Sequence, residues 1–252
     1  MSIWKIVTYT SLAFAALIAF IFLVVTPGHS ADLKKMADQM FSPTVQINKN
    51  CSGSVVYSKR DDKTGKVETI ILTAKHCLDA EAEYTVNVPV YQNNVVVKHE
   101  AFVATRRGVS YKSDLGLLVL RDTQTFFEKT AKLAPADVPL TMGEEVWTVG
   151  YPLGLALTVT QGLFGSAETL VDGKPEQYYR ATPNAAPGNS GGALYHATAS
   201  GDYELIGVTS RGAMQFFFVV FYVRAAEIEE YLKVAVPGLY PVPAASVVGG
   251  SK

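Results

Sequence analysis

The stretch that decides the fold runs from Pro187 to Leu194 and reads Pro-Gly-Asn-Ser-Gly-Gly-Ala-Leu. One glycine stands two residues before Ser190, and two glycines follow it before an apolar run begins. Glycine permits backbone conformations with φ above zero, so neighbouring N–H groups can turn toward one point. We therefore expect the N–H groups of Gly188 and Ser190 to hold the negative oxygen of a tetrahedral intermediate, with the Ser190 hydroxyl as the attacking group. The alternative interpretation is a Gly-Asn turn between two strands.

The composition indicates a folded chain with a sizeable core. Of the 252 residues, 48% are hydrophobic and 18% are charged, which suits one or two packed layers and excludes a disordered protein. The formal net charge is −1, and no run of basic residues is present. The sequence therefore offers no electrostatic footprint for nucleic acid.

An export segment is predicted at the N-terminus, over residues 1–30. Ile6–Val25 is almost wholly apolar, Lys5 precedes it, and small residues follow at Gly28 and Ser30. This pattern is typical of a secretory signal, but the apolar stretch is also long enough to span a bilayer. A cleaved signal and an uncleaved membrane anchor, which would be an N-terminal apolar helix, both remain open. Either one places the rest of the chain outside the cytoplasm, in a periplasmic or extracellular location.

The remaining chain is dominated by β-rich runs. Apolar residues at helical spacing predict a short linker helix over residues 31–42. Many short strands separated by Gly- and Asp-containing turns then predict an all-β sandwich or pair of barrels over residues 43–235. A looser stretch near residues 122–139 suits a crossing between two halves. A short helix is expected over Ala225–Leu232, and a flexible tail over residues 236–252.

A serine hydroxyl needs a base to activate it and a third group to orient that base. His76 is the best candidate base, because it directly follows the apolar run Val67–Thr73, at a strand end where a tight turn can fix an imidazole. Asp114 opens another apolar run, where its carboxylate would be desolvated unless a partner such as a histidine N–H faced it. Taken alone, Asp114 also fits a turn that starts a strand.

These three residues lie in motifs that resemble a known family. Thr-Ala-Lys-His-Cys at residues 73–77, Asp-Leu-Gly-Leu-Leu at 114–118 and Gly-Asn-Ser-Gly-Gly at 188–192 are similar to the histidine, aspartate and serine motifs of chymotrypsin-fold serine proteases, in the same order. The segment Val-Gly-Tyr-Pro-Leu-Gly at residues 149–154 resembles the bacterial HtrA-type branch. The resemblance covers roughly residues 43–232 and implies two six-stranded antiparallel β-barrels.

The resemblance also implies a role for each matched residue. Ser190 would attack the scissile carbonyl, His76 would carry the proton, and Asp114 would orient the imidazole, while the N–H groups of Gly188 and Ser190 would form an oxyanion hole. The expected function is an exported serine endopeptidase that acts on polypeptides through an acyl-enzyme. Two alternatives are a catalytically silent binding or chaperone module tethered to the membrane, and an esterase or acyl transferase.

The sequence suggests neither a metal nor another cofactor. The cysteines and histidines lack the spacing of a zinc site, and no acidic loop has the spacing of a calcium site. The partner that we expect is a polypeptide substrate, with no nucleic acid and with membrane contact only through residues 6–25. The oligomeric state is left open.

The two cysteines, Cys51 and Cys77, are an even number in a chain expected to be exported, which permits one disulfide; two free buried thiols are the alternative. Cys77 follows the histidine, and the strand opened by Cys51 is similar to the one beside the histidine turn in animal trypsins. This resemblance implies a Cys51–Cys77 bridge, which would stabilise the fold by about 3 kcal/mol through its loop length. HtrA-type enzymes generally lack this bridge, so the chain combines features of two branches.

The chain also departs from these relatives. It has no trypsin-type activation sequence, and no room for a PDZ domain is expected after Leu232, which favours a constitutively folded peptidase. By analogy, the substrate pocket is expected to include Asn184, Ser210, Arg211 and Gly212. Asn184 stands where trypsins carry an acid, so we expect cleavage after small or medium apolar residues and not after Lys or Arg. Arg211 would either recruit an acidic side chain or face outward.

Overall fold

The computed structural model describes residues 28–78, 81–92, 95–167, 169–171, 174–176, 178–213 and 216–240. The predicted export segment and the end of the predicted tail lie outside these ranges. Within the described part of the chain, none of the helices is long and apolar enough to cross a membrane.

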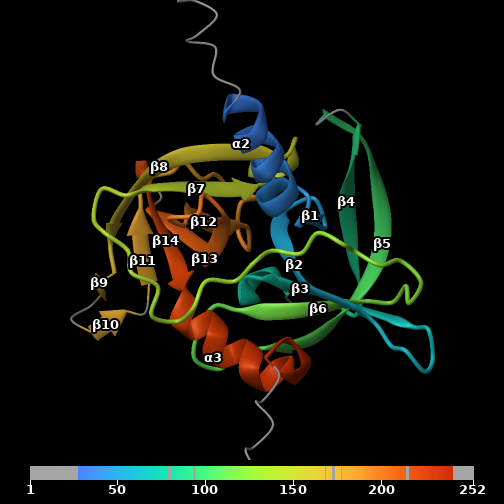
Figure 1. Ribbon diagram of the computed structural model, residues 1–252. Coiled ribbons are helices and arrows are strands. Elements are labelled where there is room, and N and C mark those ends of the chain that lie inside the picture. Colours follow the sequence, from blue (N-terminus) through green and yellow to red (C-terminus); the bar gives the residue numbers. More distant parts are fainter. Residues whose placement is uncertain are drawn as a thin grey trace, which may run out of the picture.

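The first half of the chain forms a closed barrel of six antiparallel strands, in the order β1-β2-β3-β6-β5-β4 (Figure 1). The strands are β1 (Thr44–Ile47), β2 (Cys51–Arg60), β3 (Val67–Thr73), β4 (Tyr84–Gln92), β5 (Val95–Val109) and β6 (Gly116–Leu120).

The second half closes into another six-stranded antiparallel barrel, in the order β11-β14-β13-β12-β7-β8. Its strands are β7 (Glu145–Gly150), β8 (Thr158–Ser166), β11 (Tyr178–Ala181), β12 (Ala193–Ala197), β13 (Tyr203–Ala213) and β14 (Phe216–Arg224). The prediction of two six-stranded barrels is confirmed. A small hairpin of β9 (Thr169–Val171) and β10 (Lys174–Glu176), which was not predicted, extends from the second barrel.

The apolar strands β3 and β6 are buried on both faces. Ile71 of β3 and Leu118 of β6 belong to a cluster inside the first barrel. Their neighbours Ile70, Leu72 and Leu117 belong to a different cluster, which also contains residues of the second barrel. The sequences of β3 and β6 are continuously hydrophobic because one face of each strand fills the first barrel and the other face packs against the second barrel.

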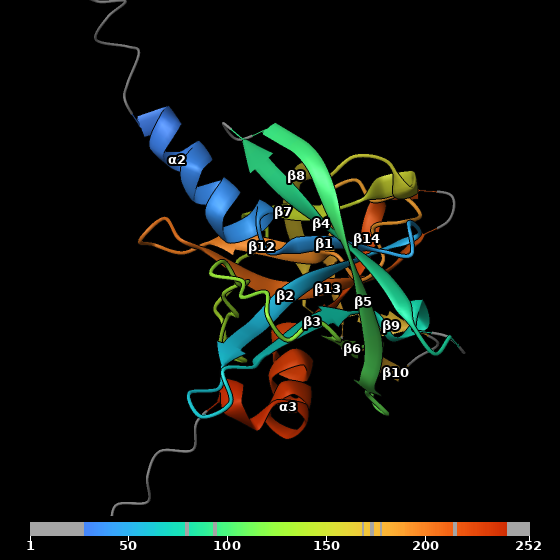
Figure 2. The ribbon, with the colours of Figure 1, turned by 90° about the vertical axis from the view of Figure 1, so that its right-hand side faces the viewer.

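In the described part of the chain, three buried clusters make up the core. One lies inside each barrel, and the largest joins both barrels to the helix α3 (Ala225–Ala235) through Ile228 and Leu232. Figure 2 shows α3 against one end of the pair of barrels and α2 (Gly28–Met36) at the opposite end. The relative position of the barrels is thus set by shared apolar burial.

The segments before the first barrel and after α3 both pack against the core shared by the barrels. The N-terminal helix α2 continues into a π-helical turn over Ala37–Phe41, and the two together cover residues 31–41 of the predicted linker helix. Of the flexible tail predicted over residues 236–252, the structure describes residues 236–240. Val236 is only 2% exposed, and a 3₁₀ turn over Pro237–Leu239 follows it. These residues pack because Val236 and Leu239 extend the apolar face of α3.

Candidate active site

His76 and Asp114 are brought together by the pairing of two strands. His76 lies in the short 3₁₀ helix η2 (Lys75–Cys77), which directly follows β3, and Asp114 lies two residues before β6. Because β3 and β6 are antiparallel and Thr73 pairs with Gly116, the end of one strand lies beside the start of the other. The register of β3 and β6 therefore places the two side chains at the same end of the first barrel.

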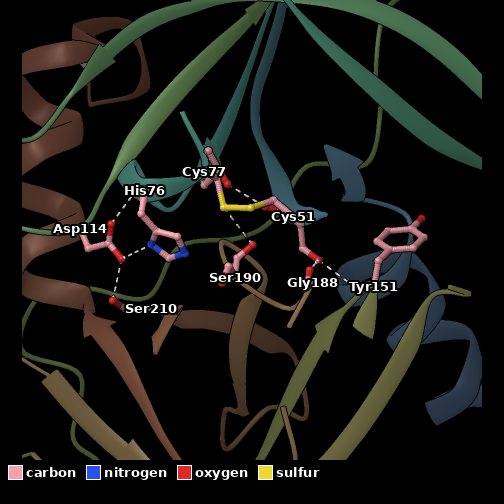
Figure 3. Close-up of a disulfide and its surroundings, with 10 residues drawn as sticks. Cys51, His76, Cys77, Asp114, Tyr151, Gly188, Ser190 and Ser210 are labelled. Atoms are coloured by element: carbon pink, nitrogen blue, oxygen red, sulfur yellow. Dashed lines mark hydrogen bonds and ion pairs between the residues drawn. A yellow bond between two sulfur atoms is a disulfide. The ribbon is translucent and has the colours of Figure 1, made fainter. Parts of the chain in front are cut away.

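Asp114 holds His76 at two points (Figure 3). The backbone N–H of His76 donates to Oδ1 of Asp114 at 3.0 Å, and Nδ1 of His76 lies 2.8 Å from Oδ2. An ionised carboxylate only accepts hydrogen bonds, so Nδ1 carries the proton and Nε2 is the basic nitrogen of the neutral ring. The exposed fractions of the side chains are 18% for Asp114 and 47% for His76, so the acid is shielded while the base reaches solvent.

The second barrel supplies a third contact to this carboxylate. The hydroxyl of Ser210, on β13, donates to Oδ2 of Asp114 at 2.6 Å. Burial on its own would raise the pKa of Asp114, but the hydrogen bonds from His76 and Ser210 outweigh it and hold the pKa below its ordinary value. Asp114 is therefore ionised at neutral pH.

Ser190 lies in the loop before β12 and shares a pocket with His76. The pocket has a volume of about 280 Å³, and its lining includes His76, Gly188, Ser190 and both cysteines. Figure 3 shows the imidazole ring of His76 between Asp114 and Ser190. The structure thus gathers the three residues singled out from the sequence at the junction of the two barrels.

The loop around Ser190 has the conformation that its glycines permit. Gly188 has φ of 101°, and a Cβ built there would lie 2.3 Å from the carbonyl oxygen of Tyr151. The carbonyl of Pro187 accepts from the N–H of Leu153 at 2.6 Å, so the N–H of Gly188, on the opposite side of that trans peptide, points away from Leu153. Among the described residues, no acceptor pairs with the N–H of Gly188 or of Ser190.

Ser52 of β2 supports this loop from the first barrel, a contact that the sequence analysis missed. Its N–H donates to the carbonyl of Ser190 at 2.8 Å, and its hydroxyl donates to the carbonyl of Gly188 at 2.7 Å. The same hydroxyl accepts from the N–H of Tyr151 at 2.9 Å. Ser52 is fully buried, so each of these polar groups is satisfied inside the protein. A serine beside the cysteine at the start of a strand gives no sign of this role.

Cys51 and Cys77 form a disulfide, with their Cα atoms 6.1 Å apart and 26 residues apart in sequence. It joins the start of β2 to the helix η2 that carries His76. Sγ of Cys77 lies 3.6 Å from the carbonyl oxygen of Ser190, so the bridge also packs against the serine loop. The covalent link therefore fixes the turn of the histidine relative to β2.

The four residues expected to form a substrate pocket all come from the second half of the chain. Ser210 contacts Asp114, and the guanidinium of Arg211 lies 5.0 Å from the ring centre of Tyr178. Asn184 is exposed and its carbonyl accepts from the hydroxyl of Thr160, while Gly212 is exposed on β13. None of the four is among the described residues that line the pocket of His76 and Ser190. Their role in substrate binding stays a prediction.

The described residues also contain no group of three or more His, Cys, Asp and Glu side chains that could hold a metal ion.

Two closed six-stranded barrels with a histidine, an aspartate and a serine at their junction define the chymotrypsin-fold class of serine proteases. Residues 51–208 match the family described as "Trypsin-like peptidase domain", and the chain belongs to this family. The family is one of peptidases, which are hydrolases of peptide bonds. The chain has no significant sequence match among curated proteins.

Solved structures share the fold at low sequence identity. A serine endoprotease from Yersinia pestis is 19% identical with a TM-score of 0.59, and the match covers 81% of this chain and 66% of that one. An HtrA-type protease, a variant of AlgW with a tripeptide, is 17% identical with a TM-score of 0.61, covering 82% and 64%. The chain thus spans slightly less than two thirds of these two proteins.

A third structure is similar over most of its length. The inactive form of a mutant of Rv3671c from M. tuberculosis H37Rv is 20% identical with a TM-score of 0.55, and the match covers 88% of this chain and 95% of that one. At these identities the likeness shows the fold alone.

The contact between Ser210 and Asp114 predicts how the acid titrates. We expect the pKa of Asp114 to lie below about 3.9, the ordinary value, and Ser210→Ala to raise it, because one hydrogen bond to the ionised form is lost. Carboxyl ¹³C NMR over a pH series measures this pKa. Since the pKa is lowered on folding, the contribution of Asp114 to stability is complete above pH of about 3.9 and is lost as the pH falls through the folded value.

The matched control for this titration is Ser113→Ala, because the hydroxyl of Ser113 donates to Ser110 and not to Asp114. It should leave the pKa of Asp114 unchanged. An equal pKa in wild type and Ser210→Ala would show that the hydroxyl of Ser210 does not stabilise the carboxylate.

Proposed function

We propose that this protein is an exported serine endopeptidase that cleaves peptide bonds with a triad of His76, Asp114 and Ser190, through an acyl-enzyme. The observation that carries the proposal is the pair of hydrogen bonds between Asp114 and His76, which lie beside a pocket that His76 shares with Ser190. The hydrogen bond at Nδ1 sets the tautomer of His76 in which Nε2 is free to act as a base toward a serine hydroxyl.

The reaction starts when Oγ of Ser190 attacks the scissile carbonyl carbon and passes its proton to Nε2 of His76. Asp114 stabilises the resulting imidazolium through Nδ1. His76 then gives the proton to the leaving amine, the C–N bond breaks, and the acyl group remains on Ser190. A water molecule attacks the acyl carbon with His76 again as base, which releases the acid and restores the hydroxyl of Ser190.

The negative oxygen of each tetrahedral intermediate binds between the N–H groups of Gly188 and Ser190. Two observations support this assignment. Neither N–H pairs with an acceptor among the described residues, and Leu153 holds the carbonyl of Pro187, which keeps the Pro187–Gly188 peptide in one orientation. Loss of one such donor typically lowers turnover on the order of 10²–10³-fold.

An active-site-directed fluorophosphonate tests the nucleophile. We expect it to add one phosphonyl group to the wild type, and Ser190→Ala to abolish labelling, because a hydroxyl activated by His76 reacts far faster than others. Intact mass measures the adduct. Ser200→Ala is the matched control, since Ser200 is an exposed serine in the turn before β13, and it should label as the wild type does.

An unlabelled wild type with its fold verified by circular dichroism would contradict the proposal and favour a silent binding module. Labelling with turnover of esters but of no peptide in a mixed library would instead favour an esterase.

Export is supported by two features, the apolar run of residues 6–25 and the disulfide, a bond that persists mainly in oxidising compartments. After expression of the whole chain in bacteria, we expect it to be recovered from the periplasm or membrane fraction with Cys51 and Cys77 protected from alkylation. Recovery from the cytoplasm with both thiols alkylated would contradict export.

A further inference from the structure

The pocket beside Ser190 lies on the leaving-group side of the site, given the proposed function on which this inference rests. It is lined by His76, which delivers the proton to the leaving amine, and by the disulfide of Cys51 and Cys77. It does not include Ser210, which lies on the Asp114 side of the imidazole. The residue that follows the scissile bond therefore enters this pocket.

One charge dominates the pocket. Among the described residues that line it, Glu81 is the one acidic side chain. Within the described part of the chain, Glu81 takes part in no ion pair, whereas the nearby Glu83 is paired with Arg121. None of the described cations therefore pairs with the carboxylate of Glu81.

The orientation of Glu81 is set by a rigid neighbour. Nδ2 of Asn48 donates to Oε2 of Glu81 at 2.6 Å. Asn48 is in turn held by Thr85, because its N–H donates to the carbonyl of Thr85 at 2.9 Å and its Oδ1 accepts from the N–H of Thr85 at 2.8 Å. Asn48 belongs to the tight turn between β1 and β2 and has φ of 47°. The chain thus fixes the carboxylate at the pocket.

The rest of the lining suits a long side chain with a charged end. The disulfide and the exposed Pro187 line the same pocket and provide apolar surface there. Lysine and arginine place their methylene groups along such surface while the charged group reaches a polar partner. A carboxylate accepts two hydrogen bonds from a guanidinium in a geometry that favours arginine.

We infer that Glu81 selects substrates with a basic residue, arginine above all, directly after the scissile bond. The selection acts on the leaving half of the substrate and is separate from any preference for the residue before the bond. It makes Glu81 a specificity-determining residue of this protein.

Acyl transfer measures this preference without knowledge of the natural substrate. p-Nitrophenyl acetate acylates Ser190 and releases p-nitrophenol. Argininamide and its neutral isostere citrullinamide then compete with water for the acetyl group. In the transfer, the amine nitrogen bonds to the acyl carbon, the bond to Oγ of Ser190 breaks, and the amine proton passes through His76 to Oγ. Mass spectrometry counts both acetylated amides in one tube, so their ratio is independent of the amount of active enzyme.

We expect argininamide to be acetylated about threefold more than citrullinamide, a factor typical of an ion pair that solvent still reaches. Glu81→Gln should bring the ratio close to one, and about 0.5 M NaCl should lower it in the wild type by screening the charges. The matched control Glu83→Gln removes an equal charge two residues away, in a side chain that Arg121 already pairs, and should keep the wild-type ratio.

A ratio of one in the wild type, or an equal ratio in wild type and Glu81→Gln, would overturn the inference while p-nitrophenol release that depends on Ser190 still supports the triad. Release as slow in the wild type as in Ser190→Ala would overturn the proposed function, and the inference with it.

Discussion

The buried residue Ser52 connects the two barrels at the point where the chemistry is proposed to occur. Its backbone and hydroxyl bind the carbonyls on both sides of the serine loop, at Ser190 and Gly188, and its hydroxyl also accepts from the start of the loop after β7. Removing a buried hydroxyl that satisfies two backbone groups lowers the stability of the fold, because each buried group left unpaired costs about 1–3 kcal/mol. The position of Ser190 relative to β2 depends on this contact.

The other half of the site is held within the first barrel. The register of β3 and β6 sets His76 beside Asp114, and the disulfide ties the helix of His76 to β2, the strand that carries Ser52. Ser210 adds the one described hydrogen bond between the second barrel and the carboxylate of Asp114. The base and the nucleophile are thus both held to β2, and the acid is held beside the base by the pairing of β3 with β6. The shared apolar cluster keeps the barrels in place.

Much of the fold and the pairing of His76 with Asp114 could be predicted from the sequence. Strand periodicity, strand-end positions and glycines around a serine each reflect local backbone preferences, and the motif order supplied the two-barrel arrangement. The contacts of Ser52, Ser210 and Glu81 could not be predicted, because they depend on the register between strands and on loops that meet across the barrels. The packing of residues 236–240 was missed because Pro and Gly in that segment indicate a loop whether or not Val236 reaches a core.

The most direct test of the account is a crystal structure of the phosphonylated protein. We predict a bond between phosphorus and Oγ of Ser190, with the phosphonyl oxygen within hydrogen-bonding distance of the N–H groups of both Gly188 and Ser190. His76 should still be bound to Asp114 through Nδ1. A phosphonyl oxygen directed away from these two N–H groups, or a phosphonyl group on another residue, would contradict it.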